Sequence, residues 1–213
     1  MIYLLQNDPR QYVAIVIVVI VSIVLHEIAH GLAAVRLGDN TPIESGHMET
    51  LNPLVHMGAT SLILLAVVGV AFGAMPINPS RLRGKYAESL VALAGPAANL
   101  VLAIVATLAL GLWFRFSPPD AENPVAANGM MLLEKLGIMN VALMLFNLLP
   151  IPPLDGSRVA ANMIPAYRRL LDSGTAQGVM IAIFFALFFG GARLIFNVAE
   201  RTYYNGVVFV AGA

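Results

Sequence analysis

The sequence QYVAIVIVVIVSIVLHEIAHGLAAV, residues 11–35, decides the fold class because it is long and apolar enough to cross a lipid bilayer as a helix. A hydrocarbon core of about 30 Å requires about 20 predominantly apolar residues. Residues 13–25 carry no charge and a single hydroxyl group, that of Ser22. Ionisable side chains follow in the same segment, and at membrane depth such side chains are costly and mark functional positions.

The pattern H-E-x-x-H lies in the second half of this segment, at His26, Glu27 and His30. Histidines four positions apart lie one helical turn apart on one face, as two ligands of a zinc ion require. The glutamate between them can accept a proton from a metal-bound water. The motif also occurs by chance on helix surfaces, but an apolar helix disfavours two solvated histidines. We therefore predict that His26 and His30 bind zinc and that Glu27 is catalytic.

The composition restricts the class of protein. Of 213 residues, 59% are hydrophobic and 11% are charged, whereas soluble domains are about 25% charged, so we expect an integral membrane protein. The formal net charge of zero argues against a nucleic-acid partner. The absence of cysteine excludes disulfides and thiolate ligands, so any metal must be bound by His, Asp or Glu. The first ten residues lack a cationic signal-peptide region, so we expect the first helix to be retained.

The apolar pattern predicts an all-α, polytopic helix bundle. Residues 59–75 form a shorter apolar stretch that contains Gly69 and Gly73 and could either cross or return. We see no internal repeat and expect a single membrane-embedded domain over residues 1–213, with a catalytic core at about 11–160. Four segments are long enough to cross the bilayer completely: 11–35, 90–114, 130–150 and 178–198.

A catalytic zinc usually has three protein ligands and one open position, so a third ligand is needed. Asp155 follows the third apolar segment in FNLLPIPPLDG, residues 146–156, where three prolines break the helix. Broken backbone at membrane depth is tolerated where it lines a cavity. On its own, Asp155 is either a ligand or a turn residue in Asp-Gly. His47 and His56 lie in a polar loop, and we expect them to be solvated or structural.

Three motifs together resemble the site-2 protease family of intramembrane zinc metalloproteases, in particular its compact bacterial members. They are HEIAH at 26–30, GPAAN at 95–99, and the stretch from Asn147 to Asp155-Gly156. The resemblance implies that His26, His30 and Asp155 bind one Zn²⁺ ion. It also implies that Glu27 acts as general base and then as acid.

The same resemblance places Asn147 near the scissile carbonyl, where it would stabilise the oxyanion; a hydrogen bond to a neighbouring helix is the alternative. Gly95, Pro96 and Asn99 are expected to be packing residues, with Asn99 satisfying backbone groups that Pro96 frees. The loop sequence NPLVH at 52–56 also resembles the bacterial branch, in which an acidic residue often follows this histidine. Here Met57-Gly58 stands at that place.

The ligand set predicts the topology. His26, His30 and Asp155 lie near the C-terminal ends of the first and third spans, so these spans should be parallel, with the second antiparallel. Residues 59–75 should then not cross fully, but be re-entrant or lie against the bundle. Positive charge should then gather at the zinc side, which the positive-inside rule places in the cytoplasm. We therefore expect a multi-pass protein of the cell (inner) membrane whose N-terminus lies on the outer side. Near the first three spans, the other side carries Arg10, Arg115 and Lys135, whereas the cations on the zinc side are Arg36, Arg81, Arg83, Lys85, Arg158, Arg168 and Arg169.

These observations lead us to expect a zinc endopeptidase that cleaves a transmembrane segment of another protein near the cytoplasmic face. By resemblance, its substrates would be membrane-tethered regulators or remnant signal peptides. Residues 38–57 and 59–75 could pair with an unwound substrate strand. One alternative is a non-catalytic relative that binds zinc and transmembrane helices. A metal transporter is less favoured, because transporters usually show repeated halves and several intramembrane carboxylates.

Overall fold

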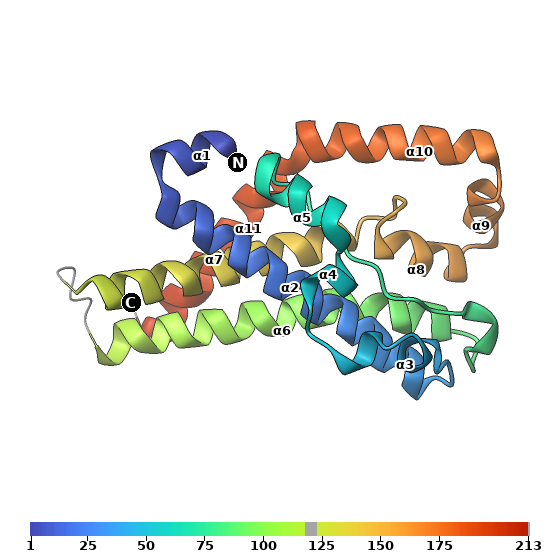
Figure 1. Cartoon of the computed structure of the whole chain (residues 1–213), viewed down its shortest axis with the longest axis horizontal. Helices are drawn as coiled ribbons and strands as arrows, with labels where there is room; N and C mark the ends of the chain where they lie inside the picture. Colours follow the sequence, from blue (N-terminus) through green and yellow to red (C-terminus); the bar gives the residue numbers. More distant parts are fainter. Residues whose placement is uncertain (118–122, 213) are drawn as a thin grey trace.

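The computed structural model describes residues 1–117 and 123–212, and these form helices without any strand. Figure 1 shows the elements arranged as an open bundle. Four helical stretches are long and apolar enough to cross a membrane: α2 (Pro9–Arg36), α6 (Ala87–Phe116), α7 (Pro124–Asn147) and Gly178–Ala211. This confirms the predicted class, an all-α polytopic membrane bundle.

The helix ends follow local capping chemistry. The Asp8 side chain accepts a hydrogen bond from the Gln11 N–H, and Pro9 occupies the first turn of α2. Asn123 and Pro124 start α7 in the same way. That helix ends at Asn147, three residues before the predicted end at residue 150, because a residue that precedes proline avoids the helical conformation.

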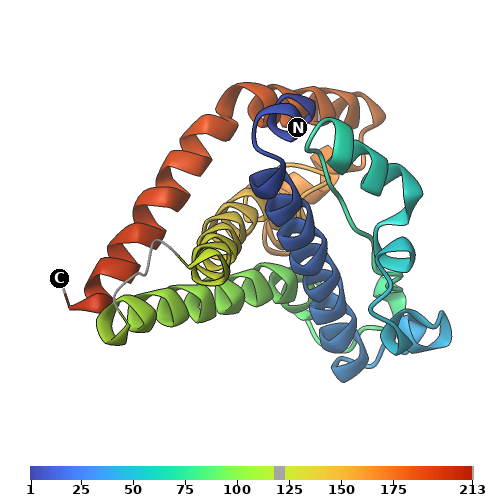
Figure 2. The same ribbon diagram turned by 60° about the vertical axis from the view of Figure 1, so that its left-hand side comes forward.

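The fourth span extends further than predicted. Helix α10 (Gly174–Ala186) continues through a π-helical turn at Leu187–Gly191 (η3) into α11 (Ala192–Ala211), beyond the predicted end at residue 198. The helix bends at this turn, as Figures 1 and 2 show, and π turns are a recognised cause of such bends. Helix α11 therefore packs on α6 and α7, whereas α10 meets α7 near the end of that helix, where Phe184 packs edge to face against Phe146.

The main core lies between α6, α7 and α11. Small residues such as Ala106 and Ala199 allow these helices to approach closely. A Cβ atom at Gly137 would lie 1.9 Å from Tyr203 Cε2, so only glycine leaves room for the buried ring. The buried residues of this cluster are Ala103, Ala106, Leu110, Ile138, Val141, Ala142, Ala199, Tyr203 and Val207.

Contacts between side chains establish the helix directions. Along α2, His26 contacts Asn99 and His30 contacts Val91, so the residue numbers of α6 fall as those of α2 rise. Helices α2 and α6 are therefore antiparallel. Asp155 follows α7 and lies beside both histidines near the end of α2, so α2 and α7 are parallel. The relative directions of the first three spans are those predicted.

Residues 58–78 return to the side on which they begin. Helix α5 (Gly58–Val67) has ten residues and extends about 15 Å, which is too short to cross. The chain turns at Gly69, whose φ is 91°, and then runs without helix toward residue 78. The Ala74 N–H donates to the His56 carbonyl at 2.8 Å, and Ser61 Oγ bonds both the carbonyl and the N–H of Phe72. As predicted, this segment is not a single full crossing.

Short elements complete the ends of the bundle. Most of them lie near the C-terminal end of α2, on the right of Figure 1, and α1 lies at the opposite end. They are α1 (Ile2–Asn7), α3 (Thr41–Glu44), η1 (His47–Glu49), α4 (Pro53–His56), η2 (Pro79–Arg81), α8 (Asp155–Met163) and α9 (Pro165–Leu171).

Asp39 ties the returning segment to the end of α2. Its side chain is fully buried, and its carboxylate accepts hydrogen bonds from the Thr41 N–H, the Thr41 hydroxyl and the Asn78 N–H. The Arg83 N–H also donates to the Leu37 carbonyl at 2.8 Å. Burial by itself raises the pKa of Asp39, but the hydrogen bonds from Thr41 and Asn78 outweigh it, so the pKa lies below its usual value.

We predict that Asp39→Asn destabilises the protein at neutral pH by about 1–3 kcal/mol, because an amide cannot accept all three hydrogen bonds. The folded-state pKa is depressed, so the stabilisation is present above the unfolded pKa of about 3.9 and is lost as pH falls through the folded value. Denaturant unfolding in detergent at pH 7 and pH 3 measures the difference between the two proteins. The difference in free energy of unfolding should be smaller at pH 3 than at pH 7. Glu49→Gln, which changes an exposed acid, is the control and should not alter the free energy of unfolding at either pH.

Candidate metal centre

Two buried histidines of α2 form the first part of the site. His26 and His30 are one helical turn apart, and their Nε2 atoms lie 3.0 Å from each other. The two rings meet edge to face, with centroids 4.6 Å apart. Both Nε2 atoms therefore point toward the same small region between α2 and the elements that pack on it.

Asp155 reaches this region from the start of α8. Its Oδ2 lies 3.1 Å from His26 Nε2, and its Oδ1 lies 3.3 Å from His30 Nε2. The Ile151 N–H donates to Leu149 O in the proline-rich break that leads to α8. A Cβ at Gly156 would lie 2.3 Å from the Leu148 carbonyl oxygen, so glycine is required where α8 begins against the end of α7. The three predicted ligands thus meet at one point.

Hydrogen bonds on the far side of each ring determine which nitrogen carries the proton. His30 Nδ1 lies 2.7 Å from the Val91 carbonyl oxygen, which can only accept, so Nδ1 donates. His26 Nδ1 lies 2.7 Å from Asn99 Oδ1, which likewise accepts. In the neutral imidazoles both Nε2 atoms then carry a lone pair. Metal-bound histidines usually donate their other ring N–H in this way.

These residues fit a zinc ion. Two lone pairs and a carboxylate face one another in a buried place, and a divalent cation would satisfy all three. Ligands about 2.0–2.2 Å from a tetrahedral zinc ion stand about 3.3–3.6 Å apart, close to the separations of 3.0–3.3 Å seen here. Asp155 Oδ2 is buried and has no hydrogen-bond partner among the described residues. Within the described parts of the chain, no other group of three such side chains comes together.

Glu27 is buried beside the ligands and lines the same cavity. That cavity has a volume of about 660 Å³, and its wall includes the three predicted ligands and Asn147. A Cβ at Gly73 would lie 2.4 Å from Glu27 Oε1, so the backbone of the returning segment runs directly against this carboxylate. The Glu27 carboxylate, the three predicted ligands and the backbone at Gly73 therefore surround the same cavity. A carboxylate in this position can take up and release a proton.

Asn147 lies in the last turn of α7, at the wall of this cavity. Its Nδ2 donates to the Leu143 carbonyl of its own helix at 3.1 Å. We find no hydrogen bond from it to a neighbouring helix among the described residues. An amide nitrogen has two hydrogens, so one N–H is left for another acceptor. Its role at the scissile carbonyl stays a prediction.

The second motif does more than pack. A Cβ at Gly95 would lie 2.4 Å from His26 Nε2 and 2.5 Å from His30 Nε2, so glycine is required there. Pro96 is buried within α6. The expectation that Asn99 satisfies backbone freed by Pro96 is wrong, because its oxygen faces His26 and its nitrogen donates to Asn140.

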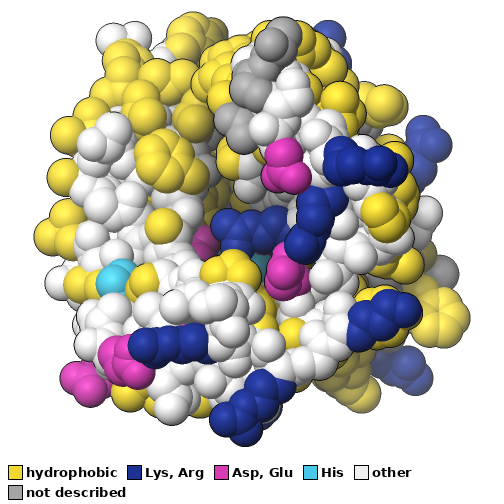
Figure 3. All heavy atoms as spheres, turned by 90° about the vertical axis from the view of Figure 1, so that its right-hand side faces the viewer, with side chains coloured by type: hydrophobic (Ala, Val, Ile, Leu, Met, Phe, Trp, Pro, Cys, Tyr) yellow, Lys and Arg dark blue, Asp and Glu magenta, His cyan; other side chains and the backbone are white. Residues whose placement is uncertain are grey.

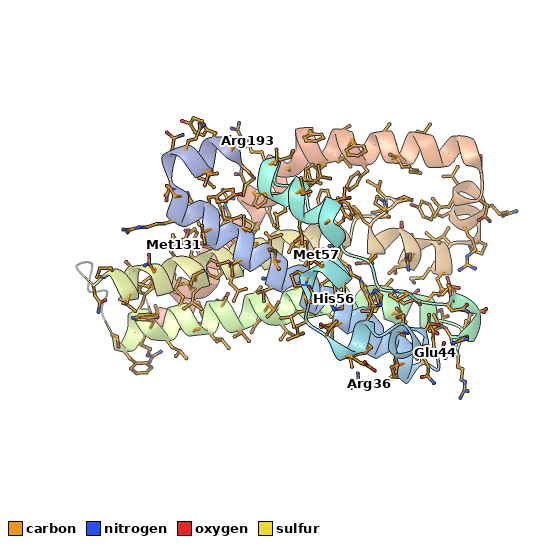
Figure 4. All side chains as sticks on the ribbon, viewed as in Figure 1. Arg36, Glu44, His56, Met57, Met131 and Arg193 are labelled. Atoms are coloured by element: carbon orange, nitrogen blue, oxygen red, sulfur yellow. The ribbon has the colours of Figure 1, made fainter. Side chains whose placement is uncertain are left out.

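The two loop histidines lie outside the ligand group. Figure 4 shows His56 on α4, beside α2. His56 is buried, and its Nε2 donates to the Thr50 carbonyl at 2.9 Å, which holds the loop together as a structural contact. The ring of His47 packs edge to face against that of His56, with centroids 5.9 Å apart.

Sequence reasoning did not find Val91 and Asn140 as parts of the site's surroundings. Val91 contributes only a carbonyl, which no side-chain pattern reveals. Asn140 could have been found, because an amide within the apolar segment 130–150 is costly and needs a partner.

The chain is similar in sequence to a peptidase family and to curated proteins named as zinc metalloproteases. The family "Peptidase family M50" matches residues 117–191. "Putative zinc metalloprotease YwhC" of Bacillus subtilis is 37% identical over 157 residues, which cover 71% of this chain and 69% of that protein. "Putative zinc metalloprotease Rip2" of Mycolicibacterium smegmatis is 34% identical over 187 residues, which cover 82% and 68%. No solved structure gives a significant match.

We predict that Asp155→Asn lowers zinc affinity by more than the roughly 10–100-fold typical of an outer-shell change, because it removes a charged ligand. Metal analysis of the purified protein, followed by titration against a chelator of known affinity, measures the effect. Asp172→Asn, at an exposed acid, is the matched control and should bind zinc as tightly as the unchanged protein. Equal affinity in Asp155→Asn would remove Asp155 from the ligand set.

Proposed function

The chain belongs to peptidase family M50, the site-2 protease family, and on this premise we propose that it is an intramembrane zinc endopeptidase. We propose further that it cleaves a transmembrane segment of another protein near the cytoplasmic face. The observation that supports this best is the convergence of Glu27 and three metal-binding side chains on one cavity inside a membrane bundle. The proposed partners are a substrate with a transmembrane helix and the lipid bilayer, without nucleic acid.

The chemistry follows from the residues that surround the cavity. When bound, zinc would supply a Lewis acid and lower the pKa of a coordinated water to about 7. Glu27 is the buried carboxylate beside the ligands, so it is placed to take the proton of the attacking water. It would then pass that proton to the nitrogen of the leaving amine. His26, His30 and Asp155 would hold the ion.

Asn147 is suited to stabilise the oxyanion. One of its N–H bonds is used within α7 and the second is available at the cavity wall. A donor of this kind contributes about 3–4 kcal/mol to the transition state when it is aimed at the developing charge.

The substrate must be presented as an extended strand, because a helix hides its carbonyls in hydrogen bonds. Residues 70–78 run without helix along the cavity, and Gly73 lies against Glu27. The backbone groups of Gly73 and Met75 make no hydrogen bond to any residue that the structure describes. They could accept the unwound strand by pairing with its backbone, as sheet edges do.

The distribution of charge supports the proposed orientation. Figure 3 shows Lys and Arg side chains around a hollow at the end of the molecule where α3, α8 and α9 lie. This is also the end at which the metal ligands meet. Because cytoplasmic loops carry an excess of Lys and Arg, we propose that this end faces the cytoplasm. The N-terminus would then lie on the outer side of the cell (inner) membrane.

Two other functions are less well supported. A non-catalytic zinc-binding relative would keep the ligands without needing a buried carboxylate beside an open cavity. A transporter would need further intramembrane sites, and the described residues contain a single group of three metal-binding side chains.

Membrane-tethered regulators or remnant signal peptides are our proposed substrates.

Glu27→Gln separates catalysis from metal binding. We expect this variant to retain zinc and to cleave at least about 100-fold more slowly, the lower end of the usual contribution of a general base. Cleavage is followed on gels with a model transmembrane substrate in liposomes, and zinc by metal analysis. Glu200→Gln, at an exposed position of α11, should cleave normally. Cleavage by Glu27→Gln at the unchanged rate would refute the base assignment.

Gly73→Ala tests the contact between the returning segment and Glu27. A Cβ there would lie 2.4 Å from Glu27 Oε1, so the carboxylate or the strand must move. We expect cleavage to slow by about 100-fold with zinc binding unchanged, since a displacement of about 1 Å can have that effect. Gly178→Ala is the control, because a Cβ at that glycine would meet nothing within 4 Å apart from its chain neighbours and the backbone of its own helix. Normal cleavage by Gly73→Ala would show that the contact is not needed.

A further inference from the structure

A chain of buried hydrogen bonds runs from His26 across α6 to α7. His26 Nδ1 lies 2.7 Å from Asn99 Oδ1, and Asn99 Nδ2 donates to Asn140 Oδ1 at 2.8 Å. Asn140 Nδ2 donates to the Leu136 carbonyl and to Ser22 Oγ, both at 2.8 Å. Asn99, Asn140 and Ser22 are each 0% exposed, so water does not compete for these contacts.

The direction of every bond in this chain follows from its far end. The Leu136 carbonyl can only accept, so the end of the Asn140 amide that faces it must be the nitrogen. The oxygen of Asn140 then faces Asn99, and only the nitrogen of Asn99 can donate to it. The oxygen of Asn99 is left for His26, so His26 Nδ1 must carry the proton. The hydroxyl of Ser22 can donate or accept and therefore imposes no direction.

We infer that Asn140 is a positioning residue that selects, through Asn99, the His26 tautomer whose Nε2 lone pair faces the metal site. Neutral histidine can carry its proton on either nitrogen, and the wrong tautomer would point an N–H at the ion. The role assigned to Asn140 rests on the zinc site proposed above. His30 needs no such chain, because the Val91 carbonyl selects its tautomer directly.

A purely structural role makes different predictions. If Asn99 and Asn140 merely hold α2, α6 and α7 together, the polarity of their bonds would not affect His26. If Asn140 acts by orienting Asn99, replacing Asn140 should no longer affect the His26 tautomer when residue 99 can only accept hydrogen bonds. Aspartate at position 99 meets that condition, because an ionised carboxylate has no donor and resembles the carboxylate–histidine–zinc arrangement.

The first experiment measures the tautomer without metal. The full-length protein is labelled with ¹⁵N-histidine, stripped of zinc and placed in lipid nanodiscs, and the His26 signals are identified by their loss in His26→Asn. At a pH at which the imidazole is neutral, we expect a protonated Nδ1 and a bare Nε2 in the unchanged protein and in Ser22→Ala. Asn140→Ala should give a mixture of tautomers. An unaltered tautomer in Asn140→Ala would overturn the assignment.

The second experiment measures zinc affinity by chelator competition in a double-mutant cycle. We expect Asn140→Ala to weaken zinc binding by about 10–100-fold, as outer-shell changes do. The same substitution in the Asn99→Asp background should weaken it by less than about threefold. An equal loss in both backgrounds would mean that Asn140 only packs, and would overturn the assignment.

Tyr203→Phe, on α11, controls for loss of a buried hydrogen bond to the helix that carries Asn140. The Tyr203 hydroxyl donates to the Leu133 carbonyl of α7 and lies outside the chain from His26. We expect it to leave the His26 tautomer unchanged; the same mixture as in Asn140→Ala would overturn the assignment. The tautomer is read in metal-free protein and does not depend on cleavage. Failure of the protease proposal, seen with Glu27→Gln, is therefore distinguishable from failure of the role given to Asn140.

Discussion

The convergence of two imidazole nitrogens and one carboxylate on a single buried point is the constraint on which the rest of the structure depends. Groups that all accept hydrogen bonds repel one another in a low-dielectric interior, and burying them is costly unless a cation lies between them. Their placement requires close packing of three helices. Gly95 and Gly156 supply the space, since a Cβ at Gly95 would collide with both imidazoles and one at Gly156 with the Leu148 carbonyl at the end of α7.

The same requirement explains the shape of the chain around the site. Helices α2 and α7 must run in parallel so that Asp155 arrives beside the histidines, and α6 must return between them. The segment that follows α2 cannot then cross the membrane. It turns at Gly69 and comes back with Gly73 against Glu27. Further along, the buried carboxylate of Asp39 binds the Asn78 N–H and so holds the segment to the end of α2. The Asp39 carboxylate thus fixes the end of the segment that lines the cavity, although Asp39 itself lies outside the cavity.

Much of the site could be predicted from local patterns. Two histidines four positions apart share a face of any helix, so the pair of histidine ligands could be predicted. A run of prolines ends any helix, so the break before Asp155 could be predicted as well. The parallel spans and the return of residues 59–75 followed from the ligands. The role of Asn99 was misjudged, because the pattern places its side chain on α6 but does not reveal that His26 and Asn140 are its partners. The helix beyond residue 198 was missed because the apolar pattern weakens there, while packing on α6 and α7 sustains it.

The sequence by itself determined that the chain is a membrane helix bundle and which side chains can bind a metal, because bilayer thickness and the helical repeat act on neighbouring residues. Only the tertiary structure decided where those side chains meet: Asp155 with the histidine pair, Gly73 with Glu27, and Asn140 with Asn99. These contacts join residues that lie between 41 and 129 positions apart. A periodic pattern specifies the face that a residue occupies, whereas the neighbour on that face is chosen by how whole helices pack.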